Sequence, residues 1–262
     1  MKVITVTNLK GGSGKTVTTA NAAAMLAADG WRVLCIDLND QADLTDTLAG
    51  EAKNGNSTDL FTGADPVKLV SNTNLIGVEM IPATEEIAML DMKLEATGRE
   101  RALLLANALK PLRRVYRYCL IDAPGSFNTA LLNALAVSDY VIIPTQADVY
   151  SLKGIRRIIT NIRQVKATVN PRLQILGILL TRYQGRRNLS KETIEALQAA
   201  ESATGARLFT SKIRENTKIA EAPGHHKTVI DYAPNSNGAE DYKAFYRELL
   251  DVMNDMNGRK DG

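Results

Sequence analysis

Residues 8–16, with the sequence NLKGGSGKT, form a glycine-rich loop of the kind that binds phosphate groups. The glycines let backbone N–H groups turn toward a triphosphate, and a helix that begins near Lys15 adds the positive end of its dipole. Lys15 supplies a full positive charge, and Thr16 offers a hydroxyl for Mg²⁺. We therefore predict nucleotide contacts from Gly11, Gly12, Ser13, Gly14, Lys15, Thr16 and Val17.

The same loop departs from the ordinary phosphate-binding pattern G-x-x-x-x-G-K-[ST]. Leu9 stands where that pattern has its first glycine, and Lys10 is a second lysine that the ordinary loop does not need. A solvated surface lysine is the structural interpretation of Lys10, and a second cation for the phosphates is the functional one. The loop is a deviant form, and its extra lysine calls for an explanation.

A phosphate loop needs a second acidic position to hold a metal ion, and residues 118–126, YCLIDAPGS, offer one. An apolar strand ends there in Asp122 and is followed by Pro124 and Gly125, which is typical of a Walker B sequence. A strand-end aspartate that caps a turn is the structural alternative. Because the phosphate loop is also present, we predict that Asp122 and Thr16 bind Mg²⁺.

Apolar, β-branched runs alternate along the chain with longer segments of helical pattern. The runs occupy residues 2–7, 32–38, 75–83, 118–124, 140–146, 173–181 and 207–213. Several of them are nearly continuous in apolar character, as strands covered on both faces are. The alternation predicts a single α/β P-loop domain over residues 1–262, with a doubly wound, mostly parallel sheet of about seven strands and helices on both faces.

The composition is that of an ordinary globular protein of 262 residues, and its net charge of +3 is too small to establish nucleic-acid binding. The N-terminal apolar run is too short for a signal peptide, and no stretch approaches 18 apolar residues. Cys35 and Cys119 lie within apolar strand-like runs, which indicates reduced, buried thiols. We expect a cytoplasmic protein that spans no membrane.

Taken together, these segments resemble the ParA/Soj-type partition ATPases of the MinD/ParA class, which share a deviant Walker A loop. The resemblance covers nearly the whole chain and is carried by residues 10–16, 35–45, 120–126, 138–154, 177–190 and 213–242. It implies ATP and Mg²⁺ as cofactors and ATP hydrolysis as the reaction. The last two segments resemble those near the nucleotide base and the DNA face of the family's dimer.

The resemblance gives the early lysine a role. In this class the residue at the position of Lys10 reaches across a two-fold dimer to the phosphate oxygens of the partner's ATP. A cation delivered in this way stabilises charge in the transition state much as an arginine finger does. Lys10 and Lys15 are then both catalytic, and the resemblance implies a homodimer that forms on ATP binding.

One departure from the family affects the hydrolysis step. The second motif of the class usually reads D-x-D-P-Q, and its second aspartate orients the attacking water, whereas here Asp37 is followed by Asn39 and Asp40. An amide positions water but does not take a proton, so we expect slow turnover that a partner accelerates. Asp40 is the alternative carboxylate for this role, Asn39→Asp is expected to raise the basal rate, and Asp37 is expected to support the metal ion.

The resemblance also implies a face that binds double-stranded DNA without sequence preference. The candidate residues lie in two separate segments and are Arg182, Arg186, Arg187, Lys212, Arg214 and Lys218. On composition alone these residues would be a solvated charged surface. Glu215 replaces a commonly basic position and weakens the patch.

The C-terminal residues 237–257 show the periodicity of an amphipathic helix, with Tyr242, Phe245 and Leu249 on one face. Docking of this helix on the sheet is the interpretation that we favour. A membrane-surface helix is disfavoured because the polar face is mainly acidic and would repel anionic lipid. We expect no helix-turn-helix before the phosphate loop, since nine residues precede Lys10.

Three functions remain open at this point. The first is an ATP-dependent dimeric switch that binds nucleoid DNA and segregates a DNA cargo with a ParB-like partner. The second is a protein of the same build that positions a protein complex or acts at a membrane. The third is a small-molecule ATP-dependent enzyme such as a synthetase, which residues 221–234 argue against because they resemble partition proteins.

Overall fold

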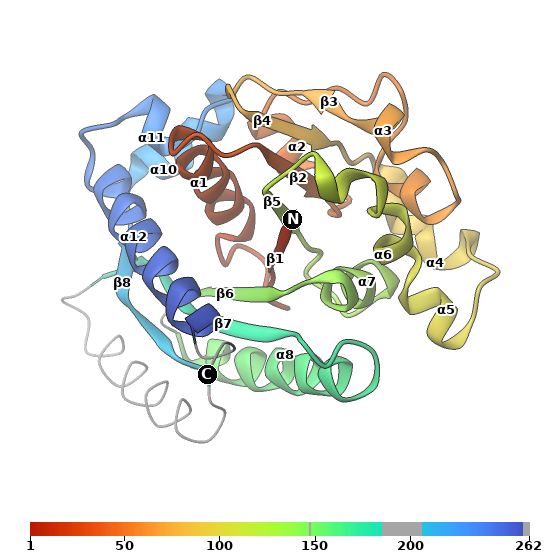
Figure 1. Ribbon diagram of the computed structural model, residues 1–262. Helices are drawn as coiled ribbons and strands as arrows, with labels where there is room; N and C mark the ends of the chain where they lie inside the picture. The colour runs from red at the N-terminus through yellow and green to blue at the C-terminus, as the bar shows by residue number, and fades with distance from the viewer. Residues whose placement is uncertain (147, 185–205, 259–262) are drawn as a thin grey trace.

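An eight-stranded sheet forms the centre of the computed structural model, which describes residues 1–146, 148–184 and 206–258 (Figure 1). The strands lie side by side in the order β3-β4-β2-β5-β1-β6-β7-β8, and all neighbours are parallel except β3 and β4. Their bounds are β1 (Lys2–Val6), β2 (Val33–Asp37), β3 (Ser71–Asn72), β4 (Val78–Ile81), β5 (Tyr118–Asp122), β6 (Tyr140–Gln146), β7 (Gln174–Tyr183) and β8 (Leu208–Arg214).

Each of the seven apolar runs of the sequence overlaps one strand, which confirms the predicted doubly wound, mostly parallel sheet. The eighth strand is the antiparallel β3, which pairs with Glu79 and Met80 of β4 at the edge of the sheet. It has two residues, Ser71 and Asn72, and neither is apolar. A pair this short and polar carries no pattern that sequence reasoning detects.

Helices cover both faces of the sheet. The α-helices are α1 (Lys15–Ala28), α2 (Asp43–Thr47), α3 (Pro66–Leu69), α4 (Leu90–Lys93), α5 (Gly98–Ala102), α6 (Leu104–Ala108), α7 (Thr129–Val137), α8 (Val149–Thr168), α10 (Thr217–Glu221), α11 (Val229–Tyr232) and α12 (Asn237–Gly258). Four 3₁₀ turns lie between them in the described residues, namely η1 (Ser57–Phe61), η2 (Glu85–Met89), η3 (Pro111–Arg114) and η4 (Ala222–His225). In Figure 1, α1 and α12 lie on one face of the sheet, and α7 and α8 lie on the other.

Two hydrophobic cores follow from the alternation of side chains along each strand. In β5, Cys119 and Ile121 point into the core beneath α7 and α8, whereas Tyr118 and Leu120 point into the core beneath α1 and α12. Both cysteine thiols are free and buried, as the sequence predicts, and burial raises the pKa of Cys119 to about 12. This makes Cys119 a packing residue, because an unionised thiol is a poor nucleophile.

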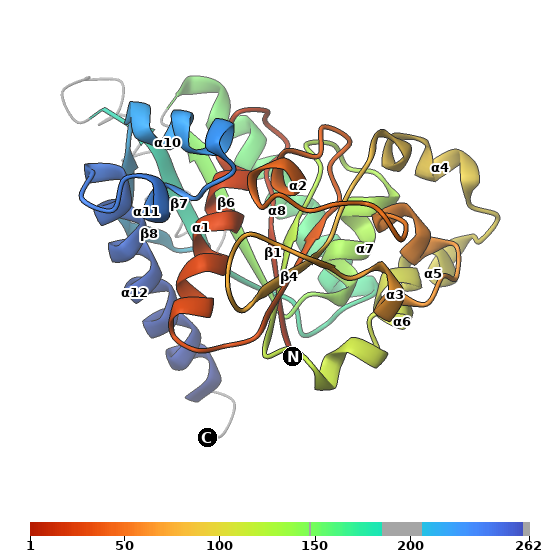
Figure 2. The same ribbon diagram turned by 90° about the horizontal axis from the view of Figure 1, so that it is seen from above.

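The parallel strands bring their carboxyl ends to one edge of the sheet, where α2 and α10 lie (Figure 2). Asp37 at the end of β2 pairs in register with Asp122 at the end of β5, and Asp122 also pairs with Val6 at the end of β1. The phosphate loop leaves β1 at this same edge. Ligand sites of open parallel sheets form at such an edge, so the fold collects the predicted chemical residues in one place.

The C-terminal helix α12 packs against β8 and α1. Its Phe245 is 1% exposed and contacts Phe209 of β8 edge to face, with ring centroids 5.1 Å apart. The carboxylate of Glu248 accepts hydrogen bonds from the backbone N–H groups of Thr210 at 2.7 Å and Ser211 at 2.8 Å. Within the described part of the chain, no helix is both long and apolar enough to cross a membrane.

The aromatic contact between α12 and β8 should carry a large share of the packing of this helix. We predict that Phe245→Ala lowers the free energy of unfolding by about 3–5 kcal/mol, because it removes a buried ring and leaves a cavity. Asp251→Ala, an exposed position on the same helix, serves as the control. Urea unfolding measures both variants, and a loss below about 1 kcal/mol for Phe245→Ala would contradict this account of the packing.

Candidate functional site

The phosphate loop adopts a conformation that requires glycine at two of its positions. Gly12 has φ 67° and Gly14 has φ 87°, both in the left-handed region that other L-residues rarely adopt. A Cβ atom on Gly14 would also lie 3.3 Å from Cγ2 of Thr181 on β7. The loop therefore passes close to the end of β7, and α1 begins directly after it at Lys15.

Polar side chains from β6, β7 and the end of β1 hold the loop in this shape. The Thr181 hydroxyl donates to the Ser13 carbonyl at 2.8 Å, and the Gln146 amide donates to the Gly12 carbonyl at 2.5 Å. Asn8 donates to the carbonyl of Pro144 at 2.8 Å. Sequence reasoning missed these positions, although each is a polar residue at the end of an apolar run, and that position is the signal that could have revealed them.

The predicted metal residues meet at one end of the loop. The Thr16 hydroxyl donates to Oδ2 of Asp122 at 2.6 Å, while Oδ1 of Asp122 is buried and makes no hydrogen bond within the described residues. A hydroxyl and a free carboxylate oxygen are the hard oxygen ligands that Mg²⁺ takes, together with phosphate oxygens. The residues present thus fit a magnesium ion at this point.

The two strand-end aspartates form a buried pair of negative charges. Burial, together with the adjacent carboxylate of Asp37, raises the pKa of Asp122 to about 8. Burial also raises the pKa of Asp37 to about 6, against three hydrogen bonds that lower it. A group with such a pKa is a candidate for a functional site, and a bound cation would bring both carboxylates to their charged form.

The carboxylate of Asp37 organises the loop that follows β2. Its oxygens accept hydrogen bonds from the backbone N–H of Asn39 at 3.0 Å and from the N–H and hydroxyl of Thr45 at 3.0 and 2.9 Å. Both oxygens are therefore engaged in fixing the chain between Leu38 and α2. This geometry favours a role for Asp37 in positioning the loop beneath the metal residues.

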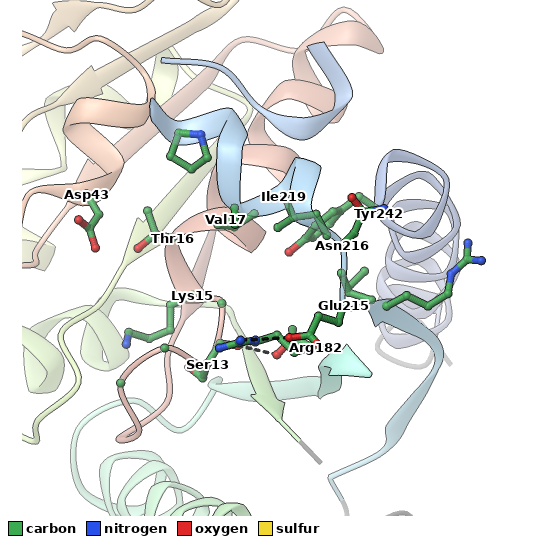
Figure 3. A pocket seen from close by; sticks show the side chains of 18 of the residues that line it. Ser13, Lys15, Thr16, Val17, Asp43, Arg182, Glu215, Asn216, Ile219 and Tyr242 are labelled. Atoms are coloured by element: carbon green, nitrogen blue, oxygen red, sulfur yellow. Dashed lines mark hydrogen bonds and ion pairs between the residues drawn. The ribbon is translucent and has the colours of Figure 1, made fainter. Parts of the chain in front are cut away.

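A cavity of about 790 Å³ opens in front of the phosphate loop. Figure 3 shows Lys15, Thr16 and Asp43 toward one end of this cavity, and Arg182, Glu215 and Tyr242 toward the other. All seven predicted nucleotide-binding residues line it, from Gly11 to Val17. From the phosphate loop, the cavity extends to a second end that is lined by residues of β7, β8, α10 and α12.

The predicted catalytic residues divide between this cavity and its surroundings. Lys15 and Asn39 line the cavity, whereas Asp40 is exposed and lines a separate hollow together with Glu85 and Glu86 of η2. Lys10 forms an ion pair with Asp148, just after β6. Asp148 is another residue that sequence reasoning missed.

The predicted DNA-binding residues that lie in the described part of the chain come together near the ends of β7 and β8. Tyr183 pairs in register with Arg214, and the ammonium of Lys212 lies 4.9 Å from the centre of the Tyr183 ring. Arg186 and Arg187 lie outside the described residues.

Three of these cations already have an acidic partner within the subunit. Arg182 lies 3.1 Å from Glu215, Arg214 lies 2.7 Å from Asp241, and Lys218 lies 2.8 Å from Glu221. The Arg182 and Lys218 pairs are exposed, and such pairs contribute little stability and are readily exchanged for phosphate. The Arg214 pair is better fixed, because Nε and Nη2 of Arg214 both donate to Asp241 of α12.

Comparisons with known proteins place this site in a family. The sequence profile of the AAA domain family matches residues 1–175. The chromosome-partitioning ATPase Soj of Thermus thermophilus is 37% identical over 247 residues, which is 94% of each chain. The sporulation initiation inhibitor protein Soj of Bacillus subtilis is 35% identical over 251 residues, which is 95% of this chain and 98% of that protein.

Solved structures agree with the fold. The crystal structure of cobyrinic acid a,c-diamide synthase from Mycobacterium smegmatis, with a bound ATP analog and magnesium, superposes with a TM-score of 0.80. It is 28% identical and covers 95% of this chain and 94% of its own. A synthase and the partitioning ATPases thus share one architecture, so the fold alone does not identify the function of this chain.

The buried aspartate pair should make the stability of the protein without metal depend on pH. An unfolded aspartate ionises near pH 4, whereas folded Asp122 keeps its proton up to about pH 8. The folded state therefore binds more protons than the unfolded state between these values, and stability falls as the pH rises through this window. Asp122→Asn removes the ionisable group but keeps an acceptor for Thr16.

We predict that, in EDTA, the melting temperature of the wild type falls more between pH 6 and pH 8 than that of Asp122→Asn. Between these two pH values the wild type should lose on the order of 2 kcal/mol more stability than the variant does. Thermal unfolding at the two pH values provides the measurement. Equal slopes for the two proteins would show that Asp122 is ionised in the folded state without a metal.

Proposed function

The chain belongs to the AAA domain family and, within it, to the Soj and ParA type of partitioning ATPases, and from this we propose that it is an ATP-driven dimeric switch that binds DNA in its ATP state. The observation that supports this proposal most directly is the second lysine. Lys10 directly precedes the loop residues that line the nucleotide cavity, and this cavity already has its own phosphate-binding lysine, Lys15. A cation in that position suits the phosphates of a second subunit.

ATP and Mg²⁺ are the proposed ligands of the cavity. The backbone of Gly11 to Thr16 and the ammonium of Lys15 would hold the phosphates. Thr16 and Asp122 would hold the Mg²⁺ ion, which neutralises charge on the phosphate oxygens when it is bound. The nucleoside would extend toward Asn216 and Tyr242 at the other end of the cavity.

Lys10 must change partners for the dimer to form. In the single subunit its ammonium is paired with Asp148, and its side chain is 32% exposed. On ATP binding, a facing subunit would present phosphate oxygens that carry more charge than one carboxylate. Exchange of Asp148 for the partner's phosphates would make dimerisation depend on the triphosphate.

The DNA face is proposed to combine the cations at the ends of β7, β8 and α10. A dimer doubles this patch, so two modest patches together give a higher affinity than either alone. Arg182 and Arg214 also line the nucleotide cavity, which couples the face to the occupant of the site. Contacts of this kind go to phosphates and carry no sequence preference.

Within the cell we propose a nucleoid-associated, cytoplasmic protein with a ParB-like partner that accelerates hydrolysis and releases the DNA. The cargo in this proposal is a plasmid, a chromosome or a mobile element. A related ATPase that positions a protein complex is the alternative. The exposed acidic residues of α12, Glu240, Asp251 and Asp255, argue against action at an anionic membrane, because they would repel its lipids.

Binding to a random-sequence DNA duplex, measured by fluorescence anisotropy, tests the proposal. We predict binding with ATP and Mg²⁺ but not with ADP or without nucleotide. The affinity should fall by at least about tenfold between 50 and 200 mM salt, because phosphate contacts release counterions. Lys10→Ala should lose both the ATP-dependent dimer and the DNA binding.

Lys53→Ala is the matched control, because Lys53 is an exposed lysine that lies outside the cavity. It should bind DNA as the wild type does. A protein that dimerises with ATP but binds no DNA in any nucleotide state would contradict the DNA switch and favour the positioning of a protein complex. Normal dimerisation and DNA binding by Lys10→Ala would contradict the role of Lys10.

A further inference from the structure

The side chain at the family's water-orienting position is an amide in this protein. Asn39 lines the nucleotide cavity, so its place in the fold suits that role. An amide can hold the attacking water by a hydrogen bond, but it does not accept a proton at neutral pH. If the reaction uses a carboxylate, that group must come from another position.

The neighbouring carboxylate is turned away from the phosphates. Asp40 does not line the nucleotide cavity, and it opens instead on the hollow formed with Thr84, Glu85 and Met89. The loop that carries Asn39 and Asp40 contributes to both hollows, and Gln41 lines each of them. Moving Asp40 to the phosphate side would require this loop to be rebuilt, although the hydrogen bond from Asn39 N–H to Asp37 fixes it.

A third carboxylate, four residues after Asn39, does face the nucleotide. Asp43 is the first residue of α2 and lines the cavity at the end where Lys15 and Thr16 lie (Figure 3). Burial and the Asp46 carboxylate raise the pKa of Asp43, and the charge of Lys15 acts against them and lowers it. Asp43 is thus directed toward the end of the cavity where the terminal phosphate of ATP is expected.

The backbone before Asp43 adopts an uncommon conformation that gives it this direction. Ala42 has φ 53°, in the left-handed region that a non-glycine residue adopts at a cost of about 1 kcal/mol. Beyond it, α2 is fixed to the floor of the site through Thr45, whose N–H and hydroxyl both donate to Asp37. Asp43 therefore stands on a short rigid element instead of a free loop.

The other carboxylate that lines the cavity within the described residues is already engaged. Glu215 lies at the opposite end, and its carboxylate is paired with Arg182 at 3.1 Å. Asp37 and Asp122 are fully buried; the first is engaged by hydrogen bonds from Asn39 and Thr45, and the second is assigned to the Mg²⁺ ion. Asp43 is the carboxylate that is both open to the cavity and placed at its phosphate end.

We propose that Asp43 supplies the carboxylate that orients the attacking water in ATP hydrolysis, in place of the aspartate that Asn39 has replaced. The proposal rests on the ATPase function proposed above. As the water oxygen forms its bond to the γ-phosphorus, the bond between that phosphorus and the β,γ-bridging oxygen breaks and ADP leaves with the electron pair. The proton of the water passes to Asp43 and then to the released phosphate or the solvent.

Variants of the 262-residue chain test this assignment. Asp43→Asn removes the carboxylate and keeps the shape of the side chain. Asp46→Asn is the matched control, because Asp46 lies in the same first turn of α2, is exposed and lines no part of the cavity. The double variant Asn39→Asp/Asp43→Asn moves the carboxylate from one position to the other.

The measurements are phosphate release at saturating Mg²⁺ and ATP, the equilibrium binding of a fluorescent ATP analogue, and ATP-dependent dimerisation. We expect Asp43→Asn to lower kcat by about 100-fold, which is typical for loss of a group that handles a proton. Its affinity for ATP should stay within about threefold of the wild type, because the effect is on the transition state. Asp46→Asn should match the wild type, and the double variant should regain activity.

Several results would overturn the assignment. These are an Asp43→Asn variant with the same kcat as Asp46→Asn, a loss of ATP binding in place of kcat, and a double variant as inactive as Asp43→Asn. A large loss of kcat in Asp40→Asn alone would assign the role to Asp40. The proposed DNA switch can fail independently of this assignment. If the wild type hydrolysed ATP without binding DNA, the DNA switch would be contradicted, and the effect of Asp43→Asn on kcat would still be measurable.

Discussion

The concentration of negative charge at one edge of the sheet is the constraint on which the rest of this structure depends. Asp37 and Asp122 are both fully buried at adjacent strand ends, and a triphosphate would bring further negative charge to the same point. Isolated buried charges are costly, so cations must be collected there. Lys15, a Mg²⁺ ion and, from a second subunit, Lys10 are the groups that our account places around this charge.

The same edge connects the nucleotide to the surfaces that respond to it. The phosphate loop is tied to the ends of β6 and β7, and β7 carries Arg182, which lines the cavity and belongs to the proposed basic face. On the other side, the His226 ring bonds the Asp46 carbonyl of α2 at 2.6 Å. The residues that we propose to bind phosphate, orient water and contact DNA thus lie close together at one edge of the sheet.

The sequence was sufficient to predict the sheet and the residues of the phosphate loop, because long apolar runs and closely spaced glycines are local signals. It was not sufficient to predict the direction of a polar side chain where the conformation of one loop residue determines that direction. Asp40 and Asp43 differ by three positions, and the left-handed Ala42 between them helps to determine which one faces the cavity. The pairing of Arg214 with Asp241 depends on the docking of a distant helix, which no local pattern records.

In our account, Lys10 of one subunit completes the site of the other, and subunit mixing tests this most directly. Lys10→Ala and Lys15→Gln are each expected to be inactive alone. In a mixed dimer, the site on the Lys10→Ala subunit keeps Lys15 and receives Lys10 from its partner. An equal mixture should regain ATPase activity, up to about half of the wild-type rate, because each mixed dimer has one complete site of its two. A mixture that stays inactive while mixed dimers form would contradict the account.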